Sequence, residues 1–505
     1  MKVAAVLVVE NESDDVAWWI AHHAALGFSA LIVCDNASTD GTWTLLQAAR
    51  GVADVRPHRT DRVMSRDELR PFALEMAVSR YGSEFDLIGI FDIQDYLTPA
   101  PGVELTDLLP SPDERAVDGV VFSVRIHGGN SYVGVPWMSP LQAYPRHAPE
   151  DFAFHEQGIL FVRPENVRER GAGRYVGLRP DGERFLTPAG RDAEAWNGGW
   201  LPEWSRACVR RFAVRSMTHR VRLLERMPGA DRRDPEWFVL DRNDIDSGIG
   251  DSGAGSQASV TEQIVGAIYR SAWSGFVRHR AFERVLSAPD TGMSGFGHTE
   301  RPRFFTVRGS GGLVLAYDTE SSRLFGCPDE ELVPEGRYRR ILVCVWESMP
   351  EWIVLVREDA VSDMTVCLRS DFIGVPQAFF PFEVRKTNGG DAAFWSPVLK
   401  RFLTMIDGDG AVWCNRLEVQ GWETFRLEPA DGRGPDWIVD SIGLLPSVVR
   451  EGLTAETFAR LSDVLEIEQS GIIPLVFTML PVEQQRHVLL AHPGMFPPSM
   501  LRVRD

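Results

Sequence analysis

The sequence contains few cysteines, and none of them form a close pair. Its six cysteines lie far apart in the 505-residue chain, without a CxxC motif. This spacing excludes a small disulfide scaffold and indicates no zinc framework. The cysteines are therefore interpreted as reduced residues that serve as small apolar side chains.

Long apolar runs and an excess of positive charge are also missing. No stretch approaches the roughly 20 apolar residues of a membrane helix. The run "VAAVLVV" at residues 3–9 is too short for a secretory core, and acids follow it instead of a cleavage site. A formal net charge of −18 disfavours nonspecific attraction to nucleic acid or anionic membranes. These absences predict a cytoplasmic protein with no transmembrane segment and no nucleic-acid partner.

Positive charge is nevertheless concentrated in one part of this acidic chain. Two interpretations are open, a site for an anion and a solvated basic helix. The arginines concerned are Arg206, Arg210, Arg211, Arg215, Arg220, Arg222 and Arg226.

The N-terminal half alternates between apolar runs and helical patterns. Residues 3–9 and "SALIVCD" at 29–35 are typical of strands buried on both faces of a sheet, and "FDLIGIFD" at 85–92 predicts a later strand. Between the first two, Ser13 is a predicted helix N-cap and Gly27 a predicted stop. This alternation predicts an α/β sheet.

Polar residues follow these strands directly. In open α/β sheets, ligands bind outside the carboxyl ends of the strands, so these residues are candidates for a binding site. They are Glu10, Asn11, Glu12, Asp35, Asn36, Asp92 and Asp95.

The rest of the chain has a different composition and a different pattern of apolar residues. Gly and Ser crowd residues 244–259, and from about 302 to 430 short alternating apolar segments are separated by glycine turns, which predicts an all-β domain. Two of these segments, "FFTVRGSGGLVLAYD" and "FLTMIDGDGAVWCN", share a frame, which suggests internal repeats in a barrel or trefoil. The predicted divisions are an α/β domain at 1–255, a linker and helix at 256–300, the β domain at 301–430 and a helical extension at 431–505.

The first 250 residues or so resemble glycosyltransferases of GT-A fold, in the family 2 and family 92-like group. The resemblance rests on "VVENESDDVAWWIAHHAALGFSALIVCDNASTDGT", on "FDIQDYL" at the place of the group's "DIDEFL", and on "FVRPENV". It implies a Rossmann-like nucleotide-diphospho-sugar transferase that takes a sugar from a UDP-sugar and passes it to a glycan or polysaccharide acceptor. The residues that would bind the donor are Asn11, Glu12, Asp35, Arg70, Asp92, Arg211 and Arg215.

The same resemblance raises a question about metal binding. GT-A enzymes use two acids to hold Mn²⁺ or Mg²⁺ against the leaving diphosphate. Here Asp92 matches the first acid, Gln94 replaces the second, and Asp95 is the remaining candidate ligand. Arg211 stands where the group often has a metal-binding histidine. The alternative is metal-independent activity, with Arg211 and Arg215 neutralising the diphosphate.

Two further alternatives concern individual site residues. For Asp35 and Asp40, the local sequence equally supports an Asx turn followed by a helix cap. The resemblance implies inverting transfer, which needs a carboxylate base. The candidates are Glu156, Asp192 and Glu194, and each has a plain surface acid as its alternative.

The β domain resembles fascin-like β-trefoils, chiefly through "FLTMIDGDGAVWCNRLEVQGWETFRLEP". The combined prediction is a GT-A glycosyltransferase joined to a trefoil and a short helical tail, with no particular oligomeric state indicated. One rival is a catalytically silent glycan- or nucleotide-binding protein that retains the fold. The other is an interaction scaffold in which the trefoil is the active part.

Overall fold

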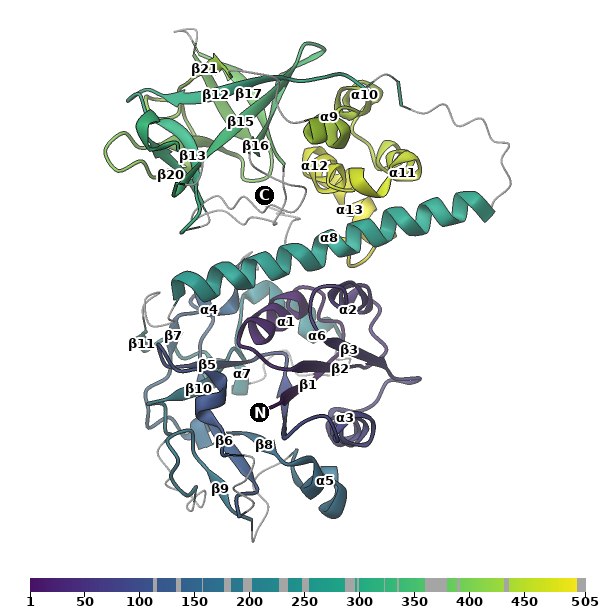
Figure 1. The fold of residues 1–505 in the computed structure, drawn as a ribbon, viewed down its shortest axis with the longest axis vertical. Helices are drawn as coiled ribbons and strands as arrows, with labels where there is room; N and C mark the ends of the chain where they lie inside the picture. Colours follow the sequence, from purple (N-terminus) through teal and green to yellow (C-terminus); the bar gives the residue numbers. More distant parts are fainter. Residues whose placement is uncertain are drawn as a thin grey trace. The chain divides into compact units, whose positions relative to one another are not determined.

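In a computed structural model, the chain forms two compact units, residues 1–264 and residues 265–505 (Figure 1). The four predicted domain ranges are a different division of the chain and stay a prediction. The structure describes residues 1–496 except for 112–115, 133–137, 157, 177–182, 194–201, 227–234, 248–253, 287–295, 298, 322, 334–335, 359–378, 388–390 and 431–435.

Unit 1 is built on a mixed sheet with the strand order β3-β2-β1-β4-β8-β6-β10-β5, and a short strand, β9, pairs with β6. The first four strands in this order are parallel, and β8 is antiparallel to both of its neighbours. The predicted α/β sheet is confirmed, with a Rossmann-like arrangement. The strands are β1 (Val3–Val9), β2 (Ala30–Asp35), β3 (Val55–Arg59), β4 (Leu87–Asp92), β5 (Asp95–Pro99), β6 (Gly119–Ile126), β8 (Gly158–Val162), β9 (Phe185–Leu186) and β10 (Ala207–Arg211). A separate pair joins β7 (Arg146–His147) to β11 (Ile245–Asp246).

Burial explains the central strands. Every residue of β1, β2 and β4 is buried, as expected for apolar runs covered on both faces. The chain moves from β1 to β2 to β3 in one direction and then returns past β1 to β4. Right-handed crossovers therefore place α1 and α2 on one face of the sheet and α3 on the other (Figure 1). The helices of unit 1 are α1 (Val16–Ala25), α2 (Thr42–Ala49), α3 (Arg66–Tyr81), α4 (Pro140–Ala143), α5 (Pro164–Arg170), α6 (Met217–Arg226) and α7 (Pro235–Leu240), with 3-10 turns η1 (Leu105–Leu108), η2 (Ala153–Glu156) and η3 (Ala172–Arg174).

The start of α1 differs from the prediction, whereas its end agrees. Asp15, not Ser13, is the N-cap residue. Ser13 instead lies in the turn before the helix, where its backbone N–H donates to Asp40 Oδ2 of a distant loop, at 3.0 Å. Gly27 follows the helix with a φ of 89°, the left-handed conformation that glycine adopts at a helix end.

Unit 2 contains a closed ring of six antiparallel strands. β12 pairs with β15, and the ring continues through β16, β17, β18 and β21 back to β12. Alternate residues such as Ile341 and Val343, or Ile353 and Leu355, belong to the core of the barrel. The strands are β12 (Arg303–Gly309), β13 (Val314–Asp318), β14 (Arg323–Cys327), β15 (Tyr338–Trp346), β16 (Met349–Arg357), β17 (Phe380–Lys386), β18 (Ala392–Ser396), β19 (Arg401–Met405), β20 (Val412–Arg416) and β21 (Phe425–Pro429), with the 3-10 turn η5 (Asp329–Glu331).

The ring corrects the predicted repeat. β12 is a ring strand, whereas β19 lies outside the ring and pairs with β20 as a hairpin. The two segments that share a sequence frame therefore occupy different places, because a glycine turn between apolar strands looks alike wherever it occurs. Hairpins β13–β14 and β19–β20 lie between ring strands. A trefoil needs a third between β16 and β17, at residues 359–378, which lie outside the described ranges, so the trefoil stays a prediction.

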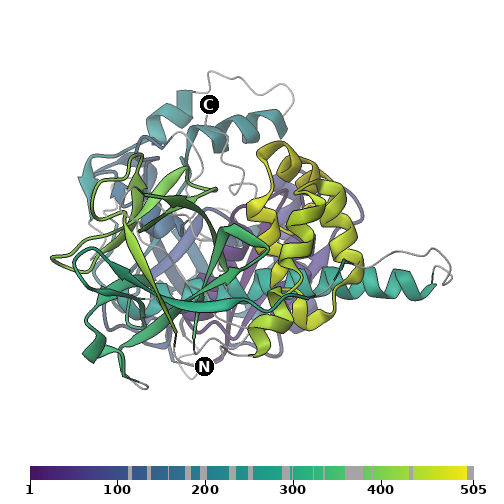
Figure 2. The same cartoon turned by 90° about the horizontal axis from the view of Figure 1, so that it is seen from above.

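Helices complete unit 2, and Figure 2 shows the C-terminal ones side by side next to the strands. The described C-terminal part of the chain is helical, as predicted. The long helix α8 (Ala254–Leu286) begins before unit 2. Its Trp273 donates from Nε1 to the Met495 carbonyl, at 2.8 Å. Among the described residues, no helix combines the length and apolar character that a membrane span requires. The other helices are α9 (Asp436–Ile442), α10 (Leu445–Glu451), α11 (Ala455–Val464), α12 (Ile472–Met479) and α13 (Val482–Ala491), with the 3-10 turn η6 (Ile467–Gln469).

Candidate functional site

The carboxyl ends of β1, β2 and β4 bring the predicted site residues together. The strand order reverses at β1, which has β2 on one side and β4 on the other. Val9 pairs with Asp35 and Val8 pairs with Asp92, so both carboxylates lie at the same edge, on either side of β1. A switch point of this kind is where open α/β sheets form their ligand crevice.

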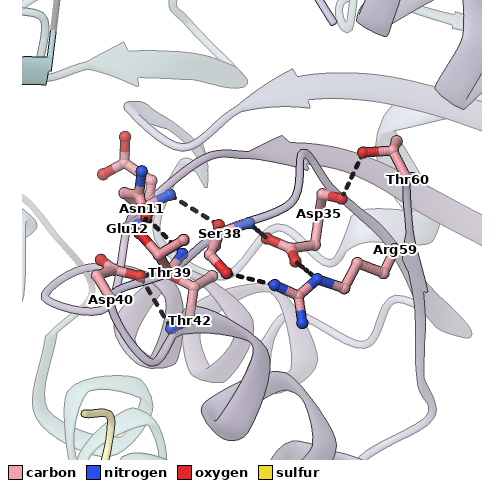
Figure 3. Close-up of polar contacts among 9 residues, drawn as sticks. All are labelled: Asn11, Glu12, Asp35, Ser38, Thr39, Asp40, Thr42, Arg59 and Thr60. Atoms are coloured by element: carbon pink, nitrogen blue, oxygen red, sulfur yellow. Dashed lines mark hydrogen bonds and ion pairs between the residues drawn. The ribbon is translucent and has the colours of Figure 1, made fainter. Parts of the chain in front are cut away.

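Asp35 is fully buried at the end of β2. Its Oδ1 accepts from the Ser38 N–H at 3.3 Å, and its Oδ2 lies 3.4 Å from Arg59 Nε (Figure 3). Arg59, at the end of β3, also donates to the Ser38 carbonyl, at 2.5 Å. Burial raises the pKa of Asp35, although the Ser38 hydrogen bonds and the charge of Arg59 oppose this shift. Asp35 is thus a buried acid that is paired with an arginine.

The loop that contains Asn11 and Glu12 is tied to the loop that follows β2 (Figure 3). Asn11 adopts a left-handed φ of 56°, and its Oδ1 accepts from the Thr39 N–H at 2.8 Å. Glu12 donates its N–H to Thr42 Oγ1, also at 2.8 Å. Asp40 Oδ1 accepts from the Thr42 N–H two residues on, which is the Asx turn considered as the alternative for Asp40. These contacts join the two loops at the carboxyl edge of the sheet.

Asn36 connects the loop after β2 to the start of helix α3. Its amide group exchanges two hydrogen bonds with the Met64 backbone, at 2.8 and 2.9 Å, just before the helix begins. A capping box between Ser65 and Glu68 then starts α3. Arg70, in the second turn, is thereby directed at the sheet edge, where its Nη1 lies 2.5 Å from Asp92 Oδ1.

Asp95 forms a second acid–arginine pair. It is fully buried, and its two carboxylate oxygens lie 2.6 and 3.0 Å from Nε and Nη2 of Arg211. The pair follows from the sheet, because Arg211 of β10 lies opposite Asp95 of β5 in the antiparallel register. Burial acts to lower the pKa of Arg211, but the Asp95 carboxylate outweighs it and the pKa is raised. Gln94, between the two acids, accepts from the Phe212 N–H through its backbone carbonyl, at 2.9 Å.

The arginine-rich segment does not form a solvated helix at the carboxyl edge of the sheet. Arg210 and Arg211 belong to β10 and are buried, and Arg215 is buried as well. Arg215 forms an ion pair with Asp15, and its pKa is raised, chiefly because this acid outweighs the effect of burial. The predicted site therefore contains arginines whose charges are balanced by acids.

The two acids predicted to bind metal do not fit a divalent ion as they are arranged. Asp92 is paired with Arg70 and Asp95 with Arg211, so a cation would have to displace or face a guanidinium. Among the residues that the structure describes, no group of three or more His, Cys, Asp or Glu side chains forms a candidate metal cluster.

One base candidate, Asp192, lies away from the carboxyl edge of the sheet. Val162 of β8 pairs with both Ile88 and Gly119, so β4 and β6 begin at the same edge. Asp192 bridges Leu186, whose strand pairs with the start of β6. Asp192 is therefore at the amino edge of these strands, opposite Asp92, where it forms an exposed ion pair with Arg184.

The other two base candidates are less fully described. Glu156 ends η2, which lies at the carboxyl end of β6, because Ile126 donates its N–H to His155 Nε2 at 3.1 Å. The structure does not describe the Glu156 side chain. Glu194 lies outside the described residues.

Sequence reasoning missed two sets of residues at this edge. Arg59, which covers Asp35, has no sequence signal, because nothing in "VRPHR" predicts a contact with the preceding strand. The second set is Trp19, His22 and His23 of α1, which contact the backbone of β5. Their i, i+3 and i+4 spacing was the sequence signal that could have grouped them on one face of the helix.

No protein-family model matches the sequence, and no curated protein matches it. Among solved structures, S. aureus TarS residues 1–349 matches with 12% identity and a TM-score of 0.25, covering 56% of this chain and 77% of that one. A complex of TarS 1–349 with UDP-GlcNAc gives 12% identity and a TM-score of 0.27, covering 56% and 78%. A longer TarS structure gives 10% identity and a TM-score of 0.26, covering 85% and 86%. Scores this low carry no argument about this chain.

Proposed function

We propose that unit 1 is a glycosyltransferase that binds a UDP-sugar at the carboxyl edge of its sheet and passes the sugar to a glycan acceptor with inversion. The observation that carries the proposal is the convergence of the residues named from the sequence. Asp35 and Asp92 flank β1 in register, and Asn11 and Glu12 follow that same strand. The sheet's switch point, the acids and the sequence resemblance all favour the same crevice.

We propose that arginines, rather than a divalent ion, neutralise the leaving diphosphate. A guanidinium carries five N–H donors in a planar fork that suits phosphate oxygens. Arg70 is the best placed, because its side chain is 15% exposed and it engages Asp92 through a single nitrogen, Nη1. Asp92 would then hold Arg70 in position, and Arg211, held by Asp95, would supply a second guanidinium. Positive groups fixed in place before the reaction stabilise developing charge without reorganisation.

The proton of the acceptor hydroxyl needs a base at the carboxyl edge. Of the three candidates, Glu156 is the one that the fold supports best, because it ends η2, which lies at the carboxyl end of β6. Asp192 lies at the opposite edge. We therefore propose Glu156 as the first base to test, with Glu194 as the next candidate.

Isothermal titration of UDP into the full chain tests the donor site and the metal proposal together. We expect binding in EDTA, with an affinity that added Mn²⁺ changes little. Arg70→Gln should weaken binding by about 10- to 100-fold, the size of a lost charge-assisted hydrogen bond. Arg184→Gln, which breaks an exposed arginine–acid pair at the opposite edge, is the matched control and should bind as the wild type does. Strict dependence on Mn²⁺ would contradict the role given to the arginines.

A second candidate function is a catalytically silent protein that binds nucleotide or glycan. The pairing of Asp92 and Asp95 with arginines favours it, since a metal-dependent enzyme would keep these acids available. A panel of UDP- and GDP-sugars, assayed for hydrolysis and transfer with Asp92→Ala as the inactive control, separates the two. UDP binding without turnover of any sugar would support the silent protein.

We also propose that the closed barrel of unit 2 is a β-trefoil that binds a glycan or a protein, and that the protein acts in the cytoplasm. The six-stranded ring with hairpins between ring strands supports the trefoil. Glycan-array binding by the full chain, with the UDP site saturated, tests the ligand class.

A further inference from the structure

Strand β5 is the last strand of the sheet in unit 1. It pairs with β10 on one side, and among the described residues no strand pairs with its other side. Gln94 just before it turns its carbonyl toward β10, where it accepts from the Phe212 N–H. The backbone N–H and C=O groups of successive residues point to opposite sides of a strand. Those of Tyr96 and Thr98 therefore also face β10, whereas those of Asp95 and Leu97 face the unpaired edge.

Helix α1 supplies side-chain partners for that edge. Trp19 Nε1 donates to the Asp95 carbonyl at 2.8 Å, and His22 Nε2 lies 2.7 Å from the Leu97 carbonyl. The Leu97 N–H donates to His23 Nε2, at 3.4 Å. The three side chains are spaced i, i+3 and i+4, which places them on one face of the helix. An indole and two imidazoles thus occupy the place of a neighbouring strand.

The hydrogen-bond partners assign the state of each imidazole. His22 meets a carbonyl through Nε2, so that nitrogen carries a proton. His23 accepts at Nε2 and lies 2.9 Å from the Trp19 carbonyl through Nδ1, so Nδ1 carries its proton. All three side chains are at most 3% exposed. Burial lowers the pKa of His22 to about 4 and that of His23 well below its usual value, which agrees with two neutral rings.

We propose that Trp19, His22 and His23 are positioning residues, which fix β5 and through it hold the Asp95 carboxylate on Arg211. Asp95 is held at two points, its carbonyl by Trp19 and its carboxylate by Arg211. An edge strand leaves the N–H and C=O groups of its outer side without a strand partner, and a shift of β5 would move the Asp95 carboxylate relative to Arg211. The consequence for ligand binding rests on the nucleotide-binding function proposed above.

Hydrogen exchange at single-residue resolution tests the structural step without any ligand. Trp19→Phe and His22→Leu each remove one donor while keeping an apolar side chain. Each should speed exchange of the Leu97 amide by about tenfold, the worth of one buried hydrogen bond. Trp273→Phe is the matched control, because its indole makes the same 2.8 Å bond to a carbonyl within unit 2. It should leave β5 unchanged. If Leu97 exchanges at the wild-type rate in both variants, the proposal is wrong.

UDP titration of the same proteins tests the consequence for the site. Affinity should fall about tenfold in Trp19→Phe and His22→Leu, and His22→Gln, which keeps a donor for the Leu97 carbonyl, should restore it. Weakening by His22→Gln equal to that by His22→Leu would contradict the positioning role. If the wild type itself binds no UDP, the nucleotide function fails, while exchange at Leu97 still decides whether α1 holds β5. If a variant does not fold, exchange in the wild type decides, because a Leu97 amide as fast as an unpaired edge amide would refute the arrangement.

Discussion

Replacing Arg211 with methionine would leave the Asp95 carboxylate buried without its partner. Asp95 is fully buried, and Arg211 meets both of its oxygens, at 2.6 and 3.0 Å. Removing one member of a buried pair costs about 3–5 kcal/mol, because the remaining charge keeps its desolvation penalty. With a urea m-value of about 3 kcal/mol/M, the unfolding midpoint of unit 1 should fall by about 1–1.7 M.

The exposed pair of Arg184 and Asp192 provides the control. Its atoms are also close, at 2.7 Å, but the side chains are 48% and 44% exposed. Arg184→Met should therefore lower the free energy of unfolding by at most about 1 kcal/mol. Hydrogen exchange of β1 and β4 peptides across a urea series reports on unit 1 alone, since a chain of two units does not unfold in one step.

The double variant Arg211→Met with Asp95→Leu sharpens the test. With both charges replaced by apolar groups, most of the lost stability should return, because the penalty lies in the uncompensated acid and not in the loss of attraction. A shift for Arg211→Met no larger than that for Arg184→Met would refute the reasoning. So would a double variant as unstable as Arg211→Met.

Two further predictions concern stability. The pKa of His22 is lowered to about 4 in the folded chain, so unfolded chains bind its proton first as the pH falls. The stability of unit 1 should therefore be undiminished above about pH 6.5 and fall progressively toward pH 4. The Tm of the unit 1 transition should fall less over that window in His22→Gln than in the wild type, and parallel curves of Tm against pH would contradict this prediction. Asn11 has a φ of 56°, so Asn11→Ala loses both the Thr39 hydrogen bond and about 1 kcal/mol to the left-handed backbone, whereas Asn11→Gly loses the bond alone. The Tm of the unit 1 transition should fall from wild type to Asn11→Gly and again to Asn11→Ala. An equal Tm for the two variants would remove the backbone argument.

The strands that the sequence predicted in unit 1 are completely buried. Apart from the aspartates that end β2 and β4, the residues of β1, β2 and β4 are apolar or glycine, because both faces of these strands are buried. β3 was missed because it is the edge strand at the other end of the sheet and reads "VRPHR", with a proline that only an edge tolerates. α12 was missed because every one of its residues is buried, so no polar face marks its period.

Within the candidate site, the sequence predicted the acids but not their partners. Asp35 and Asp92 directly end apolar strands, a pattern that can be read from the sequence alone. Arg59 of β3 reaches Asp35, Arg70 of α3 reaches Asp92, and Arg211 of β10 reaches Asp95. These contacts depend on strand register and on helix direction. Asp192 shows the reverse case, since its local sequence gave no sign that the strand register places it at the opposite edge.

The sequence by itself determined which residues end the buried strands, because the alternation of apolar runs and helices sets the parallel sheet and its carboxyl edge. It also determined that Gln94 interrupts the pair of acids expected at a metal site. Only the tertiary structure decided that each remaining acid meets an arginine, and that α1 completes the open edge of β5. The physical reason is that a charge pair or a strand edge is satisfied by whatever the fold brings within hydrogen-bond reach, and residues far apart in the chain meet there.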